Sequence, residues 1–312
     1  MVKFSFVVPT KNNFNDFKRL ANSIKIQKLR NYEVVVIDAS YDDSIENFCK
    51  KQKFRFIKQT NKKGLSNARN MGWKASKGEW IIWIDADHVL DKNFLENLDN
   101  FIKNNNFKCI APLQVFIGRK FLQKIIKTEL DTNMSNLKNR LPTVVKKNVL
   151  KKIGGWDESI KFFGEDRVFN KKIREKYEVG VSEKSIVYVE PTDNIIDLFR
   201  QAKSYGKSMS EFLKHNFSLK LSGSLVIHAS IFPLILLFFF IPQLWFPALV
   251  CFFIIVFEAM FYLVKSKSFY SIFVPLIKIF RSSVEAPLIL FYTLRRILKN
   301  MFNLTKKLLR IF

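Results

Sequence analysis

Short apolar runs alternate with segments of helical periodicity along the first third of the chain. Four runs rich in β-branched and aromatic residues predict strands: Phe4–Val8, Glu33–Ile37, Phe54–Ile57 and Trp80–Ile84. Four segments with apolar residues at helical spacing predict helices: Asn13–Gln27, Ser44–Lys50, Ser66–Lys77 and Asn93–Asn104. This alternation predicts an α/β fold, in which helices cover both faces of a mostly parallel, Rossmann-like sheet.

Two long apolar segments near the C-terminus predict a transmembrane helical hairpin. Ser224–Ile241 and Leu244–Val264 contain 18 and 21 residues, about enough to cross a ~30 Å hydrocarbon core. Only Pro242 and Gln243 separate them. Lysines flank the pair on its outer sides: Lys214 and Lys220 before it, Lys265 and Lys267 after it. By the positive-inside rule, we expect a multi-pass protein of the cell membrane with its α/β part on the cytoplasmic side.

Beyond the hairpin, polar residues recur every three or four positions among Phe, Leu and Ile, which predicts basic amphipathic helices lying in the membrane interface. A third span through Ala286–Leu294 is the alternative, although this run is shorter than the ~20 residues that a span needs. The sequence therefore predicts three parts: an α/β domain over residues 1–215, a hairpin over 216–265 and interfacial helices over 266–312.

The chain is strongly basic, with 52 Lys and Arg against 27 Asp and Glu and a net charge of +25. Such an excess favours nucleic acid, an anionic membrane surface or phosphorylated substrates as partners. No nucleic-acid-binding signature accompanies it, so we expect no nucleic-acid partner. The predicted hairpin favours a membrane.

Carboxylates follow the predicted strands at the edge where α/β sheets bind their ligands. Asp38 follows the second strand, and Asp85 and Asp87 follow the fourth. One or two carboxylates together with substrate phosphate oxygens form the coordination that Mg²⁺ or Mn²⁺ prefers. The D-x-D pair is therefore a candidate site for a divalent cation.

Two blocks of sequence carry a family resemblance. The string GLSNARNMGWKASKGEWIIWIDAD, from Gly64 to Asp87, resembles the signature of family 2 glycosyltransferases of the GT-A fold. A second block, Ile153–Glu158 followed by Phe163–Phe169, resembles the G-G-F-D-E and E-D motifs of the same family. The resemblance covers about residues 4–206. Because no Q-x-x-R-W motif follows, a non-processive enzyme is implied.

The resemblance implies a role for each matching residue. The nucleotide-sugar would be bound by residues at the strand ends and on the helix before the fourth strand: Pro9, Thr10, Asn12, Asp38, Arg69, Asp85 and Ala86. Asp38 would contact the nucleobase, and Trp156 and Asp157 would border the donor sugar and the acceptor. Asp166 would be the general base, with Glu165 beside it. Arg69 as a helix-surface ion pair and Trp156 as plain core remain alternatives.

Two departures from the family pattern affect the predicted site. Ala39 stands where a second aspartate often follows Asp38. Glu190 stands where many members have a histidine that approaches the metal. Since a carboxylate also binds hard cations, we expect Asp87, Asp85 and Glu190 to hold Mn²⁺ or Mg²⁺.

The resulting prediction is a metal-dependent, inverting glycosyltransferase at the cytoplasmic membrane face. Its donor would be a nucleoside-diphosphate sugar, with UDP favoured, and its acceptor a lipid-linked hydroxyl or a growing glycan. A polyprenyl-phosphate monosaccharide synthase is one alternative. A nucleotidyltransferase is disfavoured, because the loop after the first strand lacks the glycines of a phosphate loop. A non-catalytic membrane scaffold is the alternative of another class.

Overall fold

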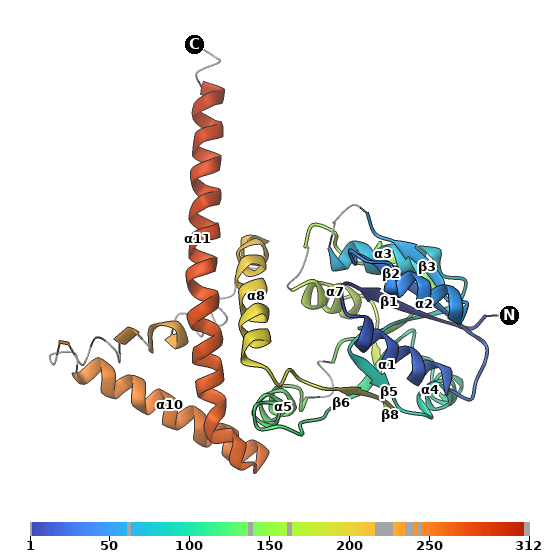
Figure 1. The fold of residues 1–312 in the computed structure, drawn as a ribbon, viewed down its shortest axis with the longest axis horizontal. Coiled ribbons are helices and arrows are strands. Elements are labelled where there is room, and N and C mark those ends of the chain that lie inside the picture. The colour runs from blue at the N-terminus through green and yellow to red at the C-terminus, as the bar shows by residue number, and fades with distance from the viewer. Residues whose placement is uncertain are drawn as a thin grey trace. The chain divides into compact units, whose positions relative to one another are not determined.

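The computed structural model describes residues 2–60, 64–136, 140–160, 164–215, 227–231, 233–234, 237, 240–241 and 245–308. The chain forms two compact units (Figure 1). Unit 1 comprises Met1–Gly118 and Asn133–Pro191, and unit 2 comprises Arg119–Thr132 and Thr192–Phe312. The chain thus leaves unit 1, contributes one segment to unit 2, and returns. The predicted domain border after residue 215 adjoins residues outside the described part and stays a prediction.

Unit 1 is built on one sheet with the strand order β3-β2-β1-β4-β7-β6-β8-β5. The strands are β1 (Phe4–Thr10), β2 (Tyr32–Asp38), β3 (Arg55–Lys58), β4 (Trp80–Trp83), β5 (His88–Leu90), β6 (Cys109–Phe116), β7 (Val144–Lys146) and β8 (Val179–Val189). β1 to β4 pair in parallel, which confirms the four predicted strands. In the other half β7 and β5 pair antiparallel with their neighbours and only β6 and β8 are parallel, so the sheet is mixed.

Helices cover both faces of the sheet, as the alternating pattern predicts (Figure 1). One face packs against α1 (Phe14–Lys25), α2 (Ser44–Gln52) and α4 (Phe94–Asn104), and the other against α3 (Leu65–Ala75), α6 (Lys147–Ile153) and α7 (Glu165–Arg174). Gly72 lets α3 lie close to β1, since a Cβ atom there would come within 2.2 Å of Val7 Cγ1. This close approach brings α3 against the strands that carry the candidate site.

Unit 2 is helical. It contains α5 (Phe121–Asn133), α8 (Ile195–His215), α10 (Trp245–Ser266), the short 3₁₀ helix η3 (Phe269–Phe273) and α11 (Val274–Leu308). Ile125 and Ile126 of α5 form a buried core with residues of the other helices: Leu198, Tyr262, Val274 and Ile277. Glu129 of α5 also accepts a hydrogen bond from Arg281 of α11 at 2.7 Å. Apolar packing and an ion pair therefore hold α5 in this unit.

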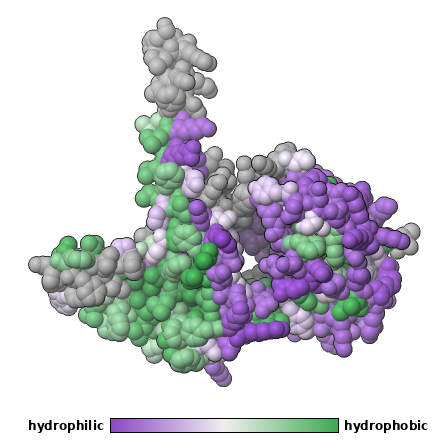
Figure 2. Space-filling view, in the orientation of Figure 1, coloured by the Kyte–Doolittle hydropathy of each residue, from purple (hydrophilic) through white to green (hydrophobic). Residues whose placement is uncertain are grey.

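One described helix, α10, is long and apolar enough to cross a membrane. It coincides with the second predicted span, and Figure 2 shows hydrophobic side chains gathered on its surface. Glu258 of α10 forms an ion pair with Lys278 of α11, and its Oε2 atom lies 2.9 Å from His228 Nε2. Eight of the 18 residues of the first predicted span, Ser224–Ile241, lie outside the described residues, so the hairpin stays a prediction. The amphipathic C-terminal segment is the single helix α11, and its interfacial position likewise stays a prediction.

Candidate active site

The ends of β1 and β2 are joined by hydrogen bonds around Asp38. Thr10 and Asp38 are register partners, and Thr10 Oγ1 donates to Asp38 Oδ1 at 2.9 Å. Ser40 Oγ donates to the same oxygen at 2.6 Å, and Lys58 Nζ lies 3.2 Å from Asp38 Oδ2. The Asp38 side chain is fully buried. Sequence reasoning missed Ser40 and Lys58, and the nucleobase contact of Asp38 stays a prediction.

The loop after β1 is held against the end of β2. Asn12 adopts a left-handed backbone conformation, with φ of 54°. Its N–H donates to Ser40 Oγ at 2.7 Å, and its Oδ1 accepts from Tyr41 N at 3.2 Å. Pro9 and Thr10 precede this loop as the last residues of β1. These bonds fix the predicted nucleotide-binding loop at the carboxyl edge of the sheet.

Arg69 joins the two acidic motifs of the sequence. Its Nη2 donates to Asp85 Oδ1 at 3.1 Å, and its Nη1 donates to Glu165 Oε1 at 3.2 Å. Asp85 follows β4, whereas Glu165 begins α7, 80 positions later in the chain. Only 7% of the Arg69 side chain is exposed, so it is not a helix-surface ion pair. One buried guanidinium therefore brings the D-x-D and E-D motifs to the same site.

Trp156 lies beneath this guanidinium. The Arg69 Cζ atom is 4.3 Å from the centre of the Trp156 ring, a distance at which cation–π attraction operates. The ring stacks on Phe169 with centroids 4.0 Å apart and meets Trp83 edge-on at 5.3 Å. Because Trp156 is buried and contacts Arg69, it belongs to both the core and the site.

Asparagines of α3 hold the Trp156 loop in place. Asn70 Nδ2 donates to Trp156 O, and Trp156 N donates to Asn70 Oδ1, both at 2.9 Å. Asn67 Nδ2 donates to Glu158 Oε2 at 2.8 Å. Gly155 has φ of 71°, and a Cβ atom there would come within 2.5 Å of Asn70 Oδ1. Sequence reasoning missed Asn67, Asn70 and Glu158, although both asparagines stand within the string from Gly64 to Asp87 that resembles the family signature.

Asp166 and Asp157 are both exposed, unlike their neighbours Glu165 and Trp156. Asp166 lies in the first turn of α7, and its Oδ1 accepts from Arg167 N at 2.7 Å. Asp157 Oδ1 accepts from Ser159 N at 2.9 Å and from Ser159 Oγ at 2.7 Å. The Asp166 carboxylate is therefore accessible from solvent.

The surroundings of Glu165 and Asp85 shift their pKa values in opposite directions. Burial raises the pKa of Glu165, although the charge of Arg69 partly offsets this effect. Desolvation acts on Asp85 too, although its side chain is only partly buried, but the charges of Arg69 and His88 and the hydrogen bond from Arg69 outweigh it and lower the pKa of Asp85. Asp85 therefore stays ionised beside the site, and Glu165 serves as a buried partner for Arg69.

Asp85, Asp87 and Glu190, the carboxylates predicted to bind a cation, lie next to the ends of strands β4, β5 and β8. The Asp87 side chain is 58% exposed, and its neighbour Ala86 is buried. His88 pairs with Val189 in the antiparallel β5–β8 ladder, so Asp87, just before β5, and Glu190, just after β8, lie at the same end of this strand pair. Glu190 Oε2 is 3.5 Å from Arg19 Nη1.

Among the described residues, no group of three or more His, Cys, Asp or Glu side chains is arranged to hold a metal alone. The oxygen ligands present nevertheless fit a hard cation that shares its coordination with substrate phosphates. Asp87 is the most accessible of them, while Asp85 is partly engaged by Arg69. Binding of metal by Glu190 stays a prediction.

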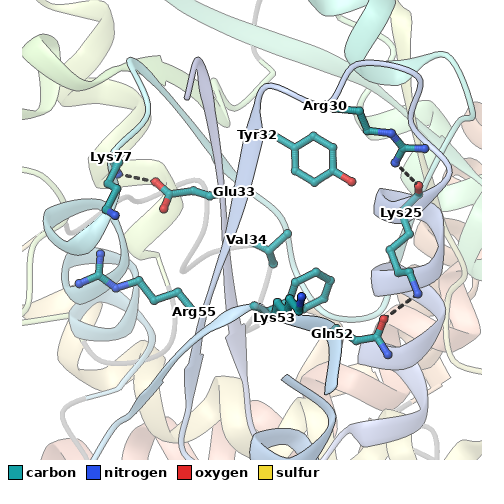
Figure 3. Close-up of a pocket in the computed structure, with 10 residues that line it drawn as sticks. Lys25, Arg30, Tyr32, Glu33, Val34, Gln52, Lys53, Arg55 and Lys77 are labelled. Atoms are coloured by element: carbon teal, nitrogen blue, oxygen red, sulfur yellow. Dashed lines mark hydrogen bonds between the residues drawn. The ribbon is translucent and has the colours of Figure 1, made fainter. Parts of the chain in front are cut away.

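A separate hollow of about 570 Å³ lies at the opposite ends of the strands. Figure 3 shows Lys25 bonded to Gln52, Arg30 bonded to the Lys25 carbonyl, and the Lys77 backbone N–H bonded to Glu33. No residue predicted for the active site lines this hollow. The candidate site is therefore at the carboxyl edge of the sheet.

The Arg69 network predicts a large stability effect. We expect Arg69→Ala to lower the free energy of unfolding of unit 1 by about 3 kcal/mol, because Glu165 would stay buried without its cationic partner. Arg55→Ala, which removes an exposed guanidinium, is the control and should have little effect. Urea unfolding followed by tryptophan fluorescence measures the change, since four of the five tryptophans lie in unit 1. Equal stability of the two variants would contradict the prediction.

Comparison with known proteins agrees with this geometry. The family model described as Glycosyl transferase family 2 matches residues 5–172. Poly(ribitol-phosphate) beta-N-acetylglucosaminyltransferase TarP of Staphylococcus aureus (strain N315) is 32% identical over 171 residues, which are 48% of this chain and 52% of TarP. The chain thus spans about half the length of this curated relative.

Solved structures show the same fold. The crystal structure of S. aureus TarS 1-349 aligns with a TM-score of 0.54 and 19% identity, covering 91% of this chain and 90% of that one. The same TarS fragment has been solved in complex with UDP-GlcNAc, with a TM-score of 0.50, 19% identity, and coverage of 72% and 76%. The mannosyltransferase PcManGT from Pyrobaculum calidifontis, in complex with GDP-Man and Mn²⁺, aligns with a TM-score of 0.50 and 15% identity, covering 69% of this chain and 65% of that chain.

Proposed function

Because the chain belongs to glycosyltransferase family 2, we propose that it transfers a sugar from a nucleoside-diphosphate sugar to an acceptor hydroxyl with inversion at the anomeric carbon. The bonds from Arg69 to both Asp85 and Glu165 are the observation that carries this proposal. Arg69 thereby links the D-x-D motif, which would contact the diphosphate, to the E-D motif, which would act on the acceptor. A glycosyltransferase needs the residues that bind the diphosphate and the residues that activate the acceptor in one site.

UDP is the proposed nucleotide. TarS has been solved with UDP and with UDP-GlcNAc, and TarP is named as an N-acetylglucosaminyltransferase. In this chain the loop of Pro9, Thr10 and Asn12 and the end of β2 would hold the nucleoside. Asp38 would act in part by ordering Thr10, since these side chains are hydrogen-bonded.

Asp87, with Asp85 and Glu190 nearby, would hold Mn²⁺ or Mg²⁺ against the donor diphosphate. When bound, the cation neutralises charge that develops on the departing diphosphate. Asp85 and Arg69 would orient the donor from the buried side of the site. Arg69 is in turn fixed by Glu165 and by the Trp156 ring.

Asp166 would act as the general base. Its exposed carboxylate, in the first turn of α7, can accept the proton of an acceptor hydroxyl as that oxygen attacks the anomeric carbon. The bond from the anomeric carbon to the diphosphate then breaks on the opposite side, which inverts the configuration. Trp156 and Asp157 would border the two sugars.

The acceptor is proposed to be a lipid-linked hydroxyl or a growing glycan at the cytoplasmic membrane face. The apolar α10 supports attachment to a membrane, where such acceptors are concentrated. The name of TarP, which denotes a poly(ribitol-phosphate) acceptor, supports the glycan alternative. Transfer to polyprenyl phosphate itself is the second candidate, because α10 would hold the site near such a lipid.

Nucleotide binding gives the most direct test. In detergent, the full chain with Mn²⁺ and UDP at about 100 times its Kd should gain about 2.7 kcal/mol of stability by mass action. We expect a rise of several degrees in the thermal midpoint of tryptophan fluorescence with UDP and a smaller rise with GDP. Omitting Mn²⁺ should reduce the shift.

Two variants make this test specific. Asp87→Asn should lose most of the effect of Mn²⁺, whereas Lys25→Ala, in the hollow at the opposite strand ends, should behave like the natural chain. If UDP, GDP and dTDP all leave the midpoint unchanged with and without Mn²⁺, the proposed function is wrong. That outcome would favour a non-catalytic membrane scaffold.

A further inference from the structure

A small cavity of about 50 Å³ lies behind Asp85 in unit 1. Side chains from α3, β4 and β5 and from the Trp156 loop line it, among them Arg69, Trp83 and His88. A water molecule needs roughly 10–15 Å³ of such space, so the cavity holds about three non-hydrogen atoms. Asp85 lines it as well, and its side chain is 46% exposed, so the cavity adjoins the proposed donor site.

Four nitrogen atoms on residues of the cavity wall are buried and have no hydrogen-bond partner among the described residues: Arg69 Nε, Trp83 Nε1, Trp156 Nε1 and His88 Nδ1. The three donor-only side chains are more than nine-tenths buried. A buried donor without an acceptor loses the hydrogen bond that it makes to water in the unfolded chain, so folded proteins rarely leave such groups unsatisfied. Four such nitrogen atoms around one cavity indicate that a bound group supplies their hydrogen-bond partners.

The chemistry of these atoms restricts the partner. Indole Nε1 and guanidinium Nε only donate hydrogen bonds, so the partner must present acceptor oxygens. Arg69 and Arg140 add positive charge to the wall and Asp85 adds negative charge, so an anionic or strongly dipolar group is favoured on the side of the arginines. A carboxylate or the acetyl carbonyl of an acetamido group supplies such oxygens and has about three non-hydrogen atoms. A single hydroxyl satisfies fewer of the donors.

We propose that this donor-lined cavity receives a carboxylate or acetamido substituent of the transferred sugar, and that the Trp83 indole N–H makes it selective for such sugars. The inference rests on the proposed function, because the substituent enters with the donor. Trp83 lies on β4, two positions before Asp85, so its ring is fixed by the same strand that ends in the D-x-D motif. Edge-on contacts with Trp156 and Phe169 hold that ring in place.

The test compares UDP-sugars that carry an acetamido or a carboxylate substituent with one that carries neither. Calorimetry on the full chain in detergent with Mn²⁺ would use UDP, UDP-glucose, UDP-N-acetylglucosamine and UDP-glucuronate. We expect either the acetamido or the carboxylate donor to bind at least about ten-fold more tightly than UDP-glucose. In Trp83→Phe, which keeps an aromatic ring but removes the N–H, this preference should fall about ten-fold with UDP affinity unchanged.

Trp80→Phe is the matched control. Trp80 is fully buried on the same strand but faces the other core, so its replacement should lower stability and keep the donor preference. Equal binding of all three sugars by the natural chain overturns the inference, as does equal behaviour of the two variants. In either case the cavity holds only water. If UDP itself does not bind, the proposed function fails and the inference falls with it.

Discussion

Replacing Asp166 with asparagine is expected to lower the rate of sugar transfer about 1,000-fold while UDP affinity stays unchanged. The variant keeps the size of the side chain and the hydrogen bond that its oxygen accepts from Arg167 N. An amide, however, cannot take up the proton of the acceptor hydroxyl. Transfer is measured as UDP release from UDP-N-acetylglucosamine with poly(ribitol phosphate) or polyprenyl phosphate as acceptor, and UDP affinity by calorimetry.

Glu175→Gln provides the control for Asp166→Asn. Glu175 is the exposed C-cap of the same helix, so this change also removes one carboxylate from α7 without touching the site. It should leave transfer unchanged. Near-normal turnover of Asp166→Asn would show that another group is the base. A parallel loss of UDP affinity would show instead that Asp166 binds the donor.

Asp87→Asn is expected to lower transfer about 100-fold and to weaken the dependence of UDP binding on Mn²⁺. The neutral amide lacks the negative charge that a hard cation prefers in its ligands. Chelation of divalent cations should lower transfer by the natural chain to a similar level and have little further effect on the variant. UDP calorimetry across a series of Mn²⁺ concentrations, together with the transfer assay, measures both changes.

Glu96→Gln is the control for Asp87→Asn. Glu96 lies on α4 and pairs with Lys28 at the surface, so its neutralisation should change neither measurement. Full activity of the natural chain in the presence of a chelator would contradict the proposed metal dependence. Loss of UDP affinity without any change in its Mn²⁺ dependence would assign Asp87 to direct contact with the nucleotide.

The parallel half of the fold and the arrangement of its carboxyl edge could be predicted because their signals are local. β1 to β4 are apolar runs separated by amphipathic helices, and each predicted helix coincides with one of α1 to α4 to within a few residues. Since parallel strands end at one edge, Thr10 and Asp38 could be expected to meet, and they are register partners. The D-x-D pair could be expected at this edge as well, because it follows β4, which is parallel to β1.

The other half of the sheet could not be predicted, because its signals depend on distant partners. β5 and β7 have three residues each, too few for any periodicity to appear. β8 is interrupted by the polar run Ser182–Ser185 and β6 contains Pro112, so neither long strand shows a clear strand pattern before the two pair with each other. Their antiparallel neighbours make the sheet mixed, which no local pattern indicated.

The burial of Arg69 shows the same limit at the site. A charged residue on an amphipathic helix usually faces water, so the alternative of a surface ion pair was reasonable. Only the meeting of α3, the end of β4, the Trp156 loop and the start of α7 gives the guanidinium two carboxylates and an aromatic ring. The donors around the cavity likewise come from separate elements, so the sequence alone gave no sign of it.

The detour of the chain through α5 limits how this protein can be shortened. Cutting after Pro191 is a natural first design for a water-soluble enzyme, since the match to the family model ends at residue 172. Such a fragment would retain α5 but lose the helices that shield Ile125 and Ile126 and the arginine that neutralises Glu129. The apolar face of α5 would then be exposed to solvent between the two chain segments of unit 1, where it would favour aggregation. A workable soluble version must therefore replace residues 119–132 with a short polar link as well as omit everything after 191.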